Sequence, residues 1–213
     1  MALVERSFRE LIEEASGEER AWREQARVVF VTLLWTGLRR GELLGLRWRD
    51  VDLADPAGPI LRVRSTWVRG AEETPKSEAG ERTISLGPDT ADELFLHRGR
   101  SSFKGDDERV FGHPTKGSVL DHKRYAETLK LALAKAKIER PMRPFHDARH
   151  SSITNAAAAG TAPEALMARA GHSDIATTQI YVDLGGERFR EEAELLERRL
   201  GIARVKGAES PQI

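Results

Sequence analysis

Tyr181 ends the segment IATTQIY at 175–181, which directly follows AGHSD at 170–174. A tyrosine hydroxyl can attack a phosphodiester as a covalent nucleophile if its neighbours neutralise the phosphate charge and handle the protons. Two segments further upstream supply such groups, HDARH at 146–150 and TGLRRGEL at 36–43. Together these segments predict a site that grips and attacks a phosphodiester.

The segment HDARH places His146, Arg149 and His150 at the start of a predicted helix. Residues three and four apart share one helix face, so the three side chains are expected to project together. An arginine beside an imidazole can clamp a phosphate and carry a proton, although an isolated H-x-x-R is usually surface charge. The two histidines also have the spacing of zinc ligands, but no glutamate follows the first as in metalloproteases. We therefore expect no metal site.

Three further positions could serve the same chemistry. Arg39 and Glu42 stand at i, i+3, where the carboxylate can direct the guanidinium or simply form a surface pair. Lys76 lies in a turn between predicted strands, a place from which an amine could deliver a proton. His172 lies in a turn between two short predicted helices. Each of these, like a partly buried Tyr181, has a simpler structural explanation when taken alone, but their joint occurrence favours a site.

The elements that must position these residues form an α+β pattern that is mainly helical, with a small three-stranded antiparallel sheet. Clusters of proline, glycine and charged residues separate the elements. We expect strands over 51–53, 60–68 and 82–86, and an extended piece at 110–111. We expect helices over 4–15, 19–35, 39–46, 88–97, 119–137 and 146–160, another that starts at 163, and a last one over 187–200.

Charge is balanced overall but uneven along the chain. Lysine and arginine together number 34, as do aspartate and glutamate, which argues against a general polyanion binder. Eight basic but only three acidic residues fall within 122–149, so one basic face could meet DNA, although solvated helix faces explain the same pattern. The sequence has no cysteine, and its longest apolar run, 28–35, is too short to span a bilayer. We expect a soluble cytoplasmic protein that associates with no membrane.

Four segments, in this order, resemble the catalytic domain of the tyrosine recombinases, the phage integrase family. TGLRRGELLGLRW at 36–48 is similar to the first arginine box of that family, and PKSEAGERTISL at 75–86 to its lysine hairpin. HDARH at 146–150 is similar to its His-x-x-Arg box, and AGHSDIATTQIY at 170–181 to its last box. The resemblance implies six catalytic residues with one supporting acid: Arg39, Lys76, His146, Arg149, His172 and Tyr181, with Glu42 in support.

The resemblance covers roughly residues 20–200, and the departures from the family pattern, at Ala148, at 169–170 and at Ser85, concern packing. It implies the fold of the DNA breaking-rejoining enzymes for a catalytic domain over 19–203. Residues 1–18 would then be an N-terminal helix or linker remnant, and 204–213 a disordered tail. Family members usually carry a separate helical core-binding domain of ~100 residues as well, whereas about 20 residues precede the catalytic region here.

The resemblance further implies a transesterification on double-stranded DNA that needs neither metal nor cofactor. Tyr181 would attack a phosphodiester, forming a 3′-phosphotyrosine bond and releasing a 5′-hydroxyl. Arg39 and Arg149 would hold the non-bridging oxygens, and Lys76 would protonate the leaving oxygen. His146 would assist removal of the tyrosine proton.

The remaining candidates would bind DNA. His172 would hydrogen-bond the phosphate. The family's assembly implies a monomer that forms a homotetramer on DNA, with the 187–200 helix packed on a neighbouring protomer or folded back on its own domain. Its action on DNA implies that the protein associates with the nucleoid. Five further DNA contacts are expected, from Arg40, Lys123, Arg124, Arg143 and His150.

Site-specific DNA recombination, by integration or excision, is the function that this resemblance implies. Two alternatives stay open. A type IB topoisomerase uses similar chemistry on one strand without bringing two sites together. A catalytically silent DNA-binding remnant would keep the fold without turnover. The intact Gly-His box and TTQIY favour a recombinase over the first alternative, and the complete catalytic set favours it over the second.

Overall fold

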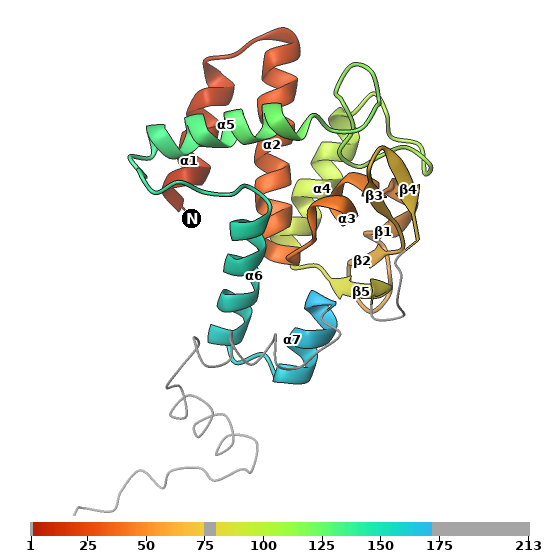
Figure 1. The fold of residues 1–213 in the computed structure, drawn as a ribbon. Coiled ribbons are helices and arrows are strands. Elements are labelled where there is room, and N and C mark those ends of the chain that lie inside the picture. The colour runs from red at the N-terminus through yellow and green to blue at the C-terminus, as the bar shows by residue number, and fades with distance from the viewer. Residues whose placement is uncertain (1, 75–79, 172–213) are drawn as a thin grey trace, which may run out of the picture.

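The computed structural model describes residues 2–74 and 80–171. Within these ranges the chain is mainly helical, with short strands between α3 and α4 (Figure 1). A 3-10 turn covers Trp48–Asp50. The helices are α1 (Ala2–Glu13), α2 (Gly17–Thr36), α3 (Arg40–Gly45), α4 (Pro88–Arg100), α5 (His122–Lys135), α6 (His146–Ala158) and α7 (Pro163–Ala170). The strands are β1 (Val51–Asp52), β2 (Ile60–Val63), β3 (Thr66–Val68), β4 (Ala71–Glu73) and β5 (Arg82–Ser85).

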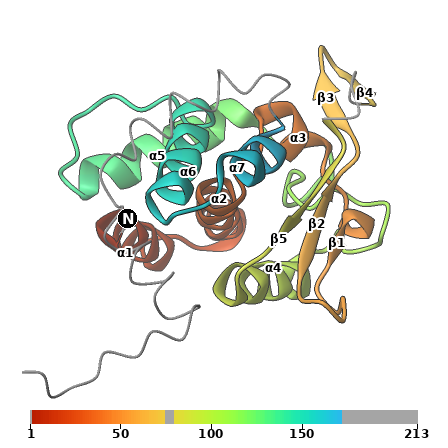
Figure 2. The same ribbon diagram turned by 90° about the horizontal axis from the view of Figure 1, so that it is seen from below.

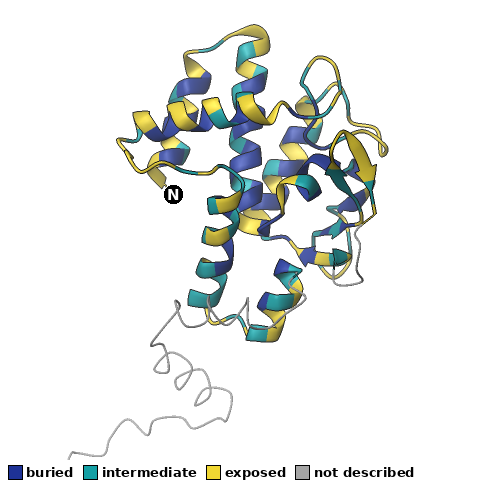
Figure 3. Cartoon of the chain, viewed as in Figure 1, coloured by how far each residue is buried: buried dark blue, intermediate teal, exposed yellow. Residues whose placement is uncertain are grey.

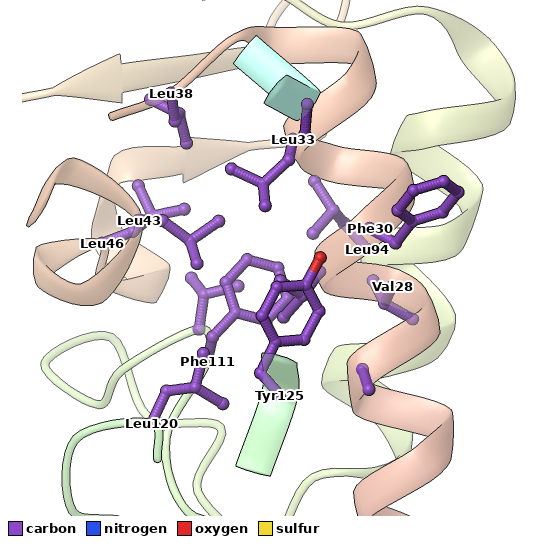
Figure 4. Close-up of a cluster of buried hydrophobic side chains, with 14 of the residues drawn as sticks. Val28, Phe30, Leu33, Leu38, Leu43, Leu46, Leu94, Phe111, Leu120 and Tyr125 are labelled. Carbon is purple, nitrogen blue, oxygen red and sulfur yellow. The ribbon is translucent and has the colours of Figure 1, made fainter. Parts of the chain in front are cut away.

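The central helix of the fold is α2, which contacts α1, α4, α5 and α6 (Figures 1 and 2). It is enclosed on several sides, which explains why its second half is apolar almost all round. Val28 and Leu33 of this helix are fully buried, and their side chains meet Phe111 and Tyr125 in the core (Figure 4). Buried residues accordingly line α2 along most of its length, whereas the outer faces of α1 and α5 are exposed (Figure 3).

The first helix packs into the same core. Val4, Phe8 and Leu11 have helical spacing and are all buried, and the Phe8 ring lies 5.6 Å from that of Phe30 on α2. The predicted amphipathic helix at this end is therefore confirmed, two residues nearer the N-terminus than expected. Its apolar face is covered by α2 and α5.

The turn after α2 brings the first arginine segment back towards the core. Gly37 has φ 66°, a left-handed conformation that favours glycine, and its N–H donates to the carbonyl of Leu33 at 2.9 Å. A Cβ at this position would lie 3.1 Å from the Ser152 hydroxyl of α6. Gly37 therefore ends α2 and lets α6 approach it, and two residues later Arg39 leads into α3.

The expected three-stranded antiparallel sheet is confirmed, with the order β1-β2-β5. The prediction of one continuous strand over 60–68 is wrong, because the chain leaves this sheet after Val63. The Ser65 hydroxyl donates to the carbonyl of Gly45 at 3.0 Å, and β3 then packs against α3. There Gly41 leaves the necessary space, since a Cβ on it would overlap the Thr66 hydroxyl.

The strand β4 was not predicted. It pairs with β3 in a separate two-stranded sheet through a tight turn in which Arg69 and Gly70 both have positive φ, 50° and 88°. Such turns fit the twist of a hairpin, but arginine is not a residue that signals them. The expected extended piece at 110–111 is likewise wrong, since these residues form a turn between two isolated bridges, Arg47 with Arg109 and Gly112 with Val119.

Two further helix boundaries differ from the prediction. Helix α4 continues to Arg100. Helix α5 begins at His122, because the Asp121 side chain accepts hydrogen bonds from the backbone N–H groups of Lys123 and Arg124 and so caps the helix. The expected helix over 187–200 lies outside the described residues. None of the described helices is long and apolar enough to cross a membrane.

Candidate active site

Arg39 occupies the N-cap position of α3, where Glu42 holds it. The Glu42 carboxylate accepts hydrogen bonds from the Arg39 backbone N–H at 2.8 Å and from its Nη1 at 2.9 Å. The first of these closes a capping box at the start of the helix. The expected i, i+3 pair is thus confirmed. It is not a surface pair, because Glu42 is 5% exposed while the Arg39 side chain is 43% exposed.

Arg82 of β5 binds the same carboxylate, and the sequence-based prediction missed it. Its Nη1 and Nη2 donate to Oε1 and Oε2 of Glu42 at 2.9 and 2.8 Å, and its side chain is 6% exposed. Burial raises the pKa of Glu42, but the hydrogen bonds and charge of Arg82, together with Arg39, outweigh this and lower that pKa to about 2. The only sequence signal was an arginine at a strand start, a position that is usually exposed.

Three arginines from three different elements meet at the last turn of α7. Arg82, Arg149 and Arg39 donate, in this order, to the three consecutive backbone carbonyls of residues 169–171, at 2.8, 2.6 and 2.7 Å. These carbonyls belong to the C-terminal end of a helix, where they lack intrahelical partners and carry partial negative charge. Helix α7 lies between α6 and β5 (Figures 1 and 2). The arginines therefore bind α7 from both sides.

Arg149 also ties α7 to the turn after α2. Its Nη1 donates to the carbonyl of Gly37 at 2.6 Å, while its Nη2 reaches Ala170. Arg39, only two residues beyond Gly37, reaches the next carbonyl of α7. The structure thus brings together Arg39 and Arg149, two of the residues that the sequence singled out.

A second contact fixes the end of α7. The Arg169 guanidinium lies 5.5 Å over the Trp35 ring of α2 and donates to the Trp35 carbonyl. That carbonyl also accepts from the Ser152 hydroxyl of α6 at 3.2 Å. Gly171 then ends α7 in a left-handed conformation, φ 63°. Arg169 therefore holds the end of α7 against α2.

His146 and His150 form a contacting pair on α6. Their Nε2 atoms lie 3.2 Å apart and their ring centroids 4.2 Å apart. Nδ1 of His146 lies 3.3 Å from Oδ1 of Asp147, whose pKa is lowered to about 2, chiefly by a hydrogen bond from the Arg143 backbone N–H. An ionised carboxylate favours the tautomer with the proton on Nδ1, which leaves a lone pair on Nε2 of His146. Burial lowers the pKa of His150, and so does repulsion from the neighbouring His146 ring when that ring is protonated.

The other basic candidates differ in their surroundings. Arg40 and Lys123 are exposed at the starts of α3 and α5. Arg124 is not brought to the arginine cluster, because it pairs with Glu19 at 2.6 Å and lies 4.7 Å over the ring of Trp22. Arg143 is 70% exposed and pairs with Asp147.

A groove of about 390 Å³ opens beside the histidine pair. Its lining includes Arg140, Arg143, Asp147 and His150, so both charged and imidazole groups face it. Within the described ranges, no cluster of three or more histidine, aspartate or glutamate side chains could hold a metal ion.

Three of the expected catalytic residues, Lys76, His172 and Tyr181, lie outside the described residues. The second tyrosine of the sequence, Tyr125, is fully buried, and burial raises the pKa of its hydroxyl. Its Oη has no hydrogen-bond partner among the described residues. Tyr125 is a core residue and has no access to a substrate.

Comparison with known sequences identifies the family. The pattern of the phage integrase family matches residues 3–188. The chain belongs to the phage integrase family. Two relatives support this membership. A protein named as a prophage phiRv2 integrase, from Mycobacterium tuberculosis, is 34% identical over 172 residues, which are 77% of this chain and 44% of that protein. The integrase of Mycobacterium phage D29 is 30% identical over 184 residues, 84% of this chain and 48% of that protein. The chain thus spans about half the length of these integrases.

Solved structures show the same family fold. The Tn1549 transposon integrase, in complex with circular intermediate DNA, superposes with a TM-score of 0.67 over 92% of this chain and 64% of that one, at 23% identity. The XerA recombinase superposes with a TM-score of 0.61 over 92% of this chain and 62% of that one, also at 23% identity. These likenesses show that the helices and small sheets of this chain have the fold of these two proteins.

Proposed function

We propose that this chain carries the catalytic region of a site-specific recombinase, which cleaves and rejoins double-stranded DNA through a 3′-phosphotyrosine intermediate. Its role would be the integration or excision of a DNA element. Family membership and the names of the relatives support this reaction class. The six positions that the sequence supplies give it a chemical basis.

The observation that carries the proposal is the convergence of Arg39 and Arg149. They come from α3 and α6, yet they donate to adjacent carbonyls at the end of α7. In the sequence, His172 follows that end immediately and Tyr181 follows nine residues later. Two guanidinium groups at the end of α7 could hold the non-bridging oxygens of a phosphodiester and stabilise its transition state without a metal.

Each remaining residue has a proposed task. Tyr181 is the nucleophile, and the other tyrosine of the sequence, Tyr125, is buried in the core. His146 accepts the tyrosine proton, a role that suits the lone pair that Asp147 favours on Nε2. Lys76 protonates the 5′-oxygen, and His172 hydrogen-bonds the phosphate. Assistance is needed because a free tyrosine has a pKa of about 10.

We further propose double-stranded DNA as the partner, bound by a monomer that assembles into a tetramer on its sites. The exposed Arg40, Lys123 and Arg143 are suited to contact phosphates. Arg124, which is held by Glu19 and Trp22, is a weaker candidate. His150 would reach DNA from the groove beside α6.

The experiment is a covalent-trapping assay. The chain is incubated at low salt with a pool of nicked duplexes of randomised sequence, in which cleavage releases a short fragment and prevents religation. Adducts that survive SDS are recovered and their DNA sequenced. The proposal expects an enriched sequence joined to protein through a 3′-phosphate. Folded protein that yields no adduct would refute it.

The chain offers a matched control for the nucleophile. Tyr181→Phe should abolish the adduct, whereas Tyr125→Phe should leave it unchanged, because the buried Tyr125 hydroxyl reaches no substrate. An adduct that persists in Tyr181→Phe would contradict the assignment. Relaxation of supercoils without strand exchange between two sites would instead indicate a topoisomerase.

A further inference from the structure

Arg82 is more deeply buried than Arg39, its neighbour at the end of α7. Its side chain is 6% exposed, whereas that of Arg39 is 43% exposed. Its hydrogen bonds go to protein acceptors: both oxygens of Glu42, the carbonyl of Arg169 at 2.8 Å and the carbonyl of Gly80 at 3.3 Å. Four of its five N–H donors are thus used within the protein, and the buried side chain is not accessible to DNA. Its role must therefore be exerted through its neighbours.

Those neighbours include Arg39. The Glu42 carboxylate accepts two hydrogen bonds from Arg82 and two from Arg39, so a single buried negative charge is shared by two arginines. If a neutral side chain replaced Arg82, Arg39 alone would balance the negative charge of Glu42. A guanidinium that alone must balance a buried carboxylate is a differently placed phosphate ligand.

Arg82 also reaches α7 directly. Its bond to the carbonyl of residue 169 is the first in the series of three, and the bonds of Arg149 and Arg39 to residues 170 and 171 follow it. The same guanidinium therefore fixes both the carboxylate that directs Arg39 and the helix end that Arg39 and Arg149 contact. A shift of β5 would disturb both arginines together.

We propose that Arg82 is a positioning residue for DNA cleavage, which sets Arg39 through Glu42 and sets the end of α7 through Arg169. This inference rests on the proposed function. It implies that Arg82 affects the rate of cleavage at saturating DNA and leaves the affinity for DNA unchanged. Displacing a group by about 1 Å from its productive position can cost roughly 100-fold in rate.

The test uses a nicked duplex that wild-type protein traps, and measures the single-turnover rate of adduct formation, the Kd for DNA and the thermal unfolding curve. Arg82→Gln is expected to slow adduct formation by roughly 100-fold with an unchanged Kd. Arg62→Gln is the matched control, because Arg62 lies on the neighbouring strand β2 in a partly exposed pair with Asp52. It should react at the wild-type rate.

A double variant separates positioning from general damage to the fold. Glu42→Gln removes the charge that Arg82→Gln leaves unbalanced, so the double variant should react faster than Arg82→Gln alone. Arg82→Lys keeps the charge but cannot bridge Glu42 and Arg169, and should be intermediate. Arg82→Lys also replaces Arg82→Gln as the test variant if Arg82→Gln does not fold.

Two results would overturn the inference: a wild-type rate in folded Arg82→Gln or Arg82→Lys, or a double variant no faster than Arg82→Gln. Failure of the wild-type chain to form any adduct would instead count against the proposed function. The two failures are therefore distinguishable in one set of measurements.

Discussion

Arg39 donates a hydrogen bond to the backbone carbonyl of Gly171 at 2.7 Å, across 132 positions of sequence. The bond joins the start of α3 to the end of α7. It depends on the left-handed conformation of Gly171, φ 63°, which ends the helix. The placement of an expected catalytic arginine is thus linked to the backbone immediately before His172.

Gly171→Ala tests this link. A Cβ in the left-handed region is strained and should cost about 1 kcal/mol of stability, and relief of that strain would move the carbonyl away from Arg39. We expect slower single-turnover adduct formation together with a modest fall in Tm.

Gly160 provides the matched control, because it also has positive φ, 80°, while no heavy atom lies within 4 Å of the position that a Cβ would take there. Gly160→Ala should lose similar stability but keep the cleavage rate. Equal rates in the two variants would show that the Gly171 link has no part in catalysis.

Arg149→Lys tests whether the two hydrogen bonds of the Arg149 guanidinium are needed for cleavage. The guanidinium bridges the carbonyls of Gly37 and Ala170, each at 2.6 Å, and an ammonium cannot span the two in the same way. We expect a loss of roughly 100-fold or more in the rate of adduct formation, and about 1 kcal/mol in the free energy of unfolding. Arg20→Lys, in an exposed helical pair with Glu24, should change neither. A wild-type rate for Arg149→Lys would remove Arg149 from the proposed phosphate clamp.

The lowered pKa of Glu42 predicts that the stability of the fold decreases in acid. Its pKa is about 2 in the folded chain against an ordinary 4.5, so the unfolded state binds the extra proton between these values. The stabilisation is complete above about pH 4.5 and is lost as the pH falls through 2. It amounts to about 3 kcal/mol.

Urea unfolding at a series of pH values measures this stabilisation. Wild-type protein should lose stability over that acidic window. Glu42→Gln should be less stable near neutral pH and should lose less stability on acidification, because only the contribution of other carboxylates such as Asp147, whose pKa is also lowered, remains. A wild-type curve that matched the Glu42→Gln curve in shape would contradict the pKa shift.

Much of the fold follows from local sequence, whereas the arginine cluster does not. Helical spacing at Val4, Phe8 and Leu11 and the glycine after α2 suffice to place α1 and the end of α2. The capping pair of Arg39 and Glu42 is also local. Arg82 meets Glu42 across 40 positions of sequence, and neither the burial of β5 at that point nor the approach of α7 has a local signature.

The two-stranded sheet escaped prediction for a related reason. Its turn uses Arg69 in a left-handed conformation, which residue type alone does not suggest. The break after Val63 depends on Gly41 and Gly45 of α3, which lack side chains and so leave room for the chain at residues 65–67. In both cases, packing between segments that are distant in sequence determines the local backbone conformation.

The lowered pKa of the buried His97 predicts a second pH range, mostly above that of Glu42, in which stability decreases. Its ring is buried against Trp48 and Phe111 and lies 2.8 Å from the Val110 carbonyl, to which Nε2–H can donate. Burial lowers the pKa of His97 from 6.5 to about 4, so protonation favours the unfolded state between these values. Stability should fall as the pH drops from about 6.5 to 4, by about 3 kcal/mol, before the Glu42 window is complete. His97→Gln keeps a donor for the Val110 carbonyl but cannot titrate, so its unfolding free energy should fall by less than that of the wild type over this range. If the wild type and His97→Gln lost the same free energy there, the buried imidazole would not be the neutral group that its surroundings require.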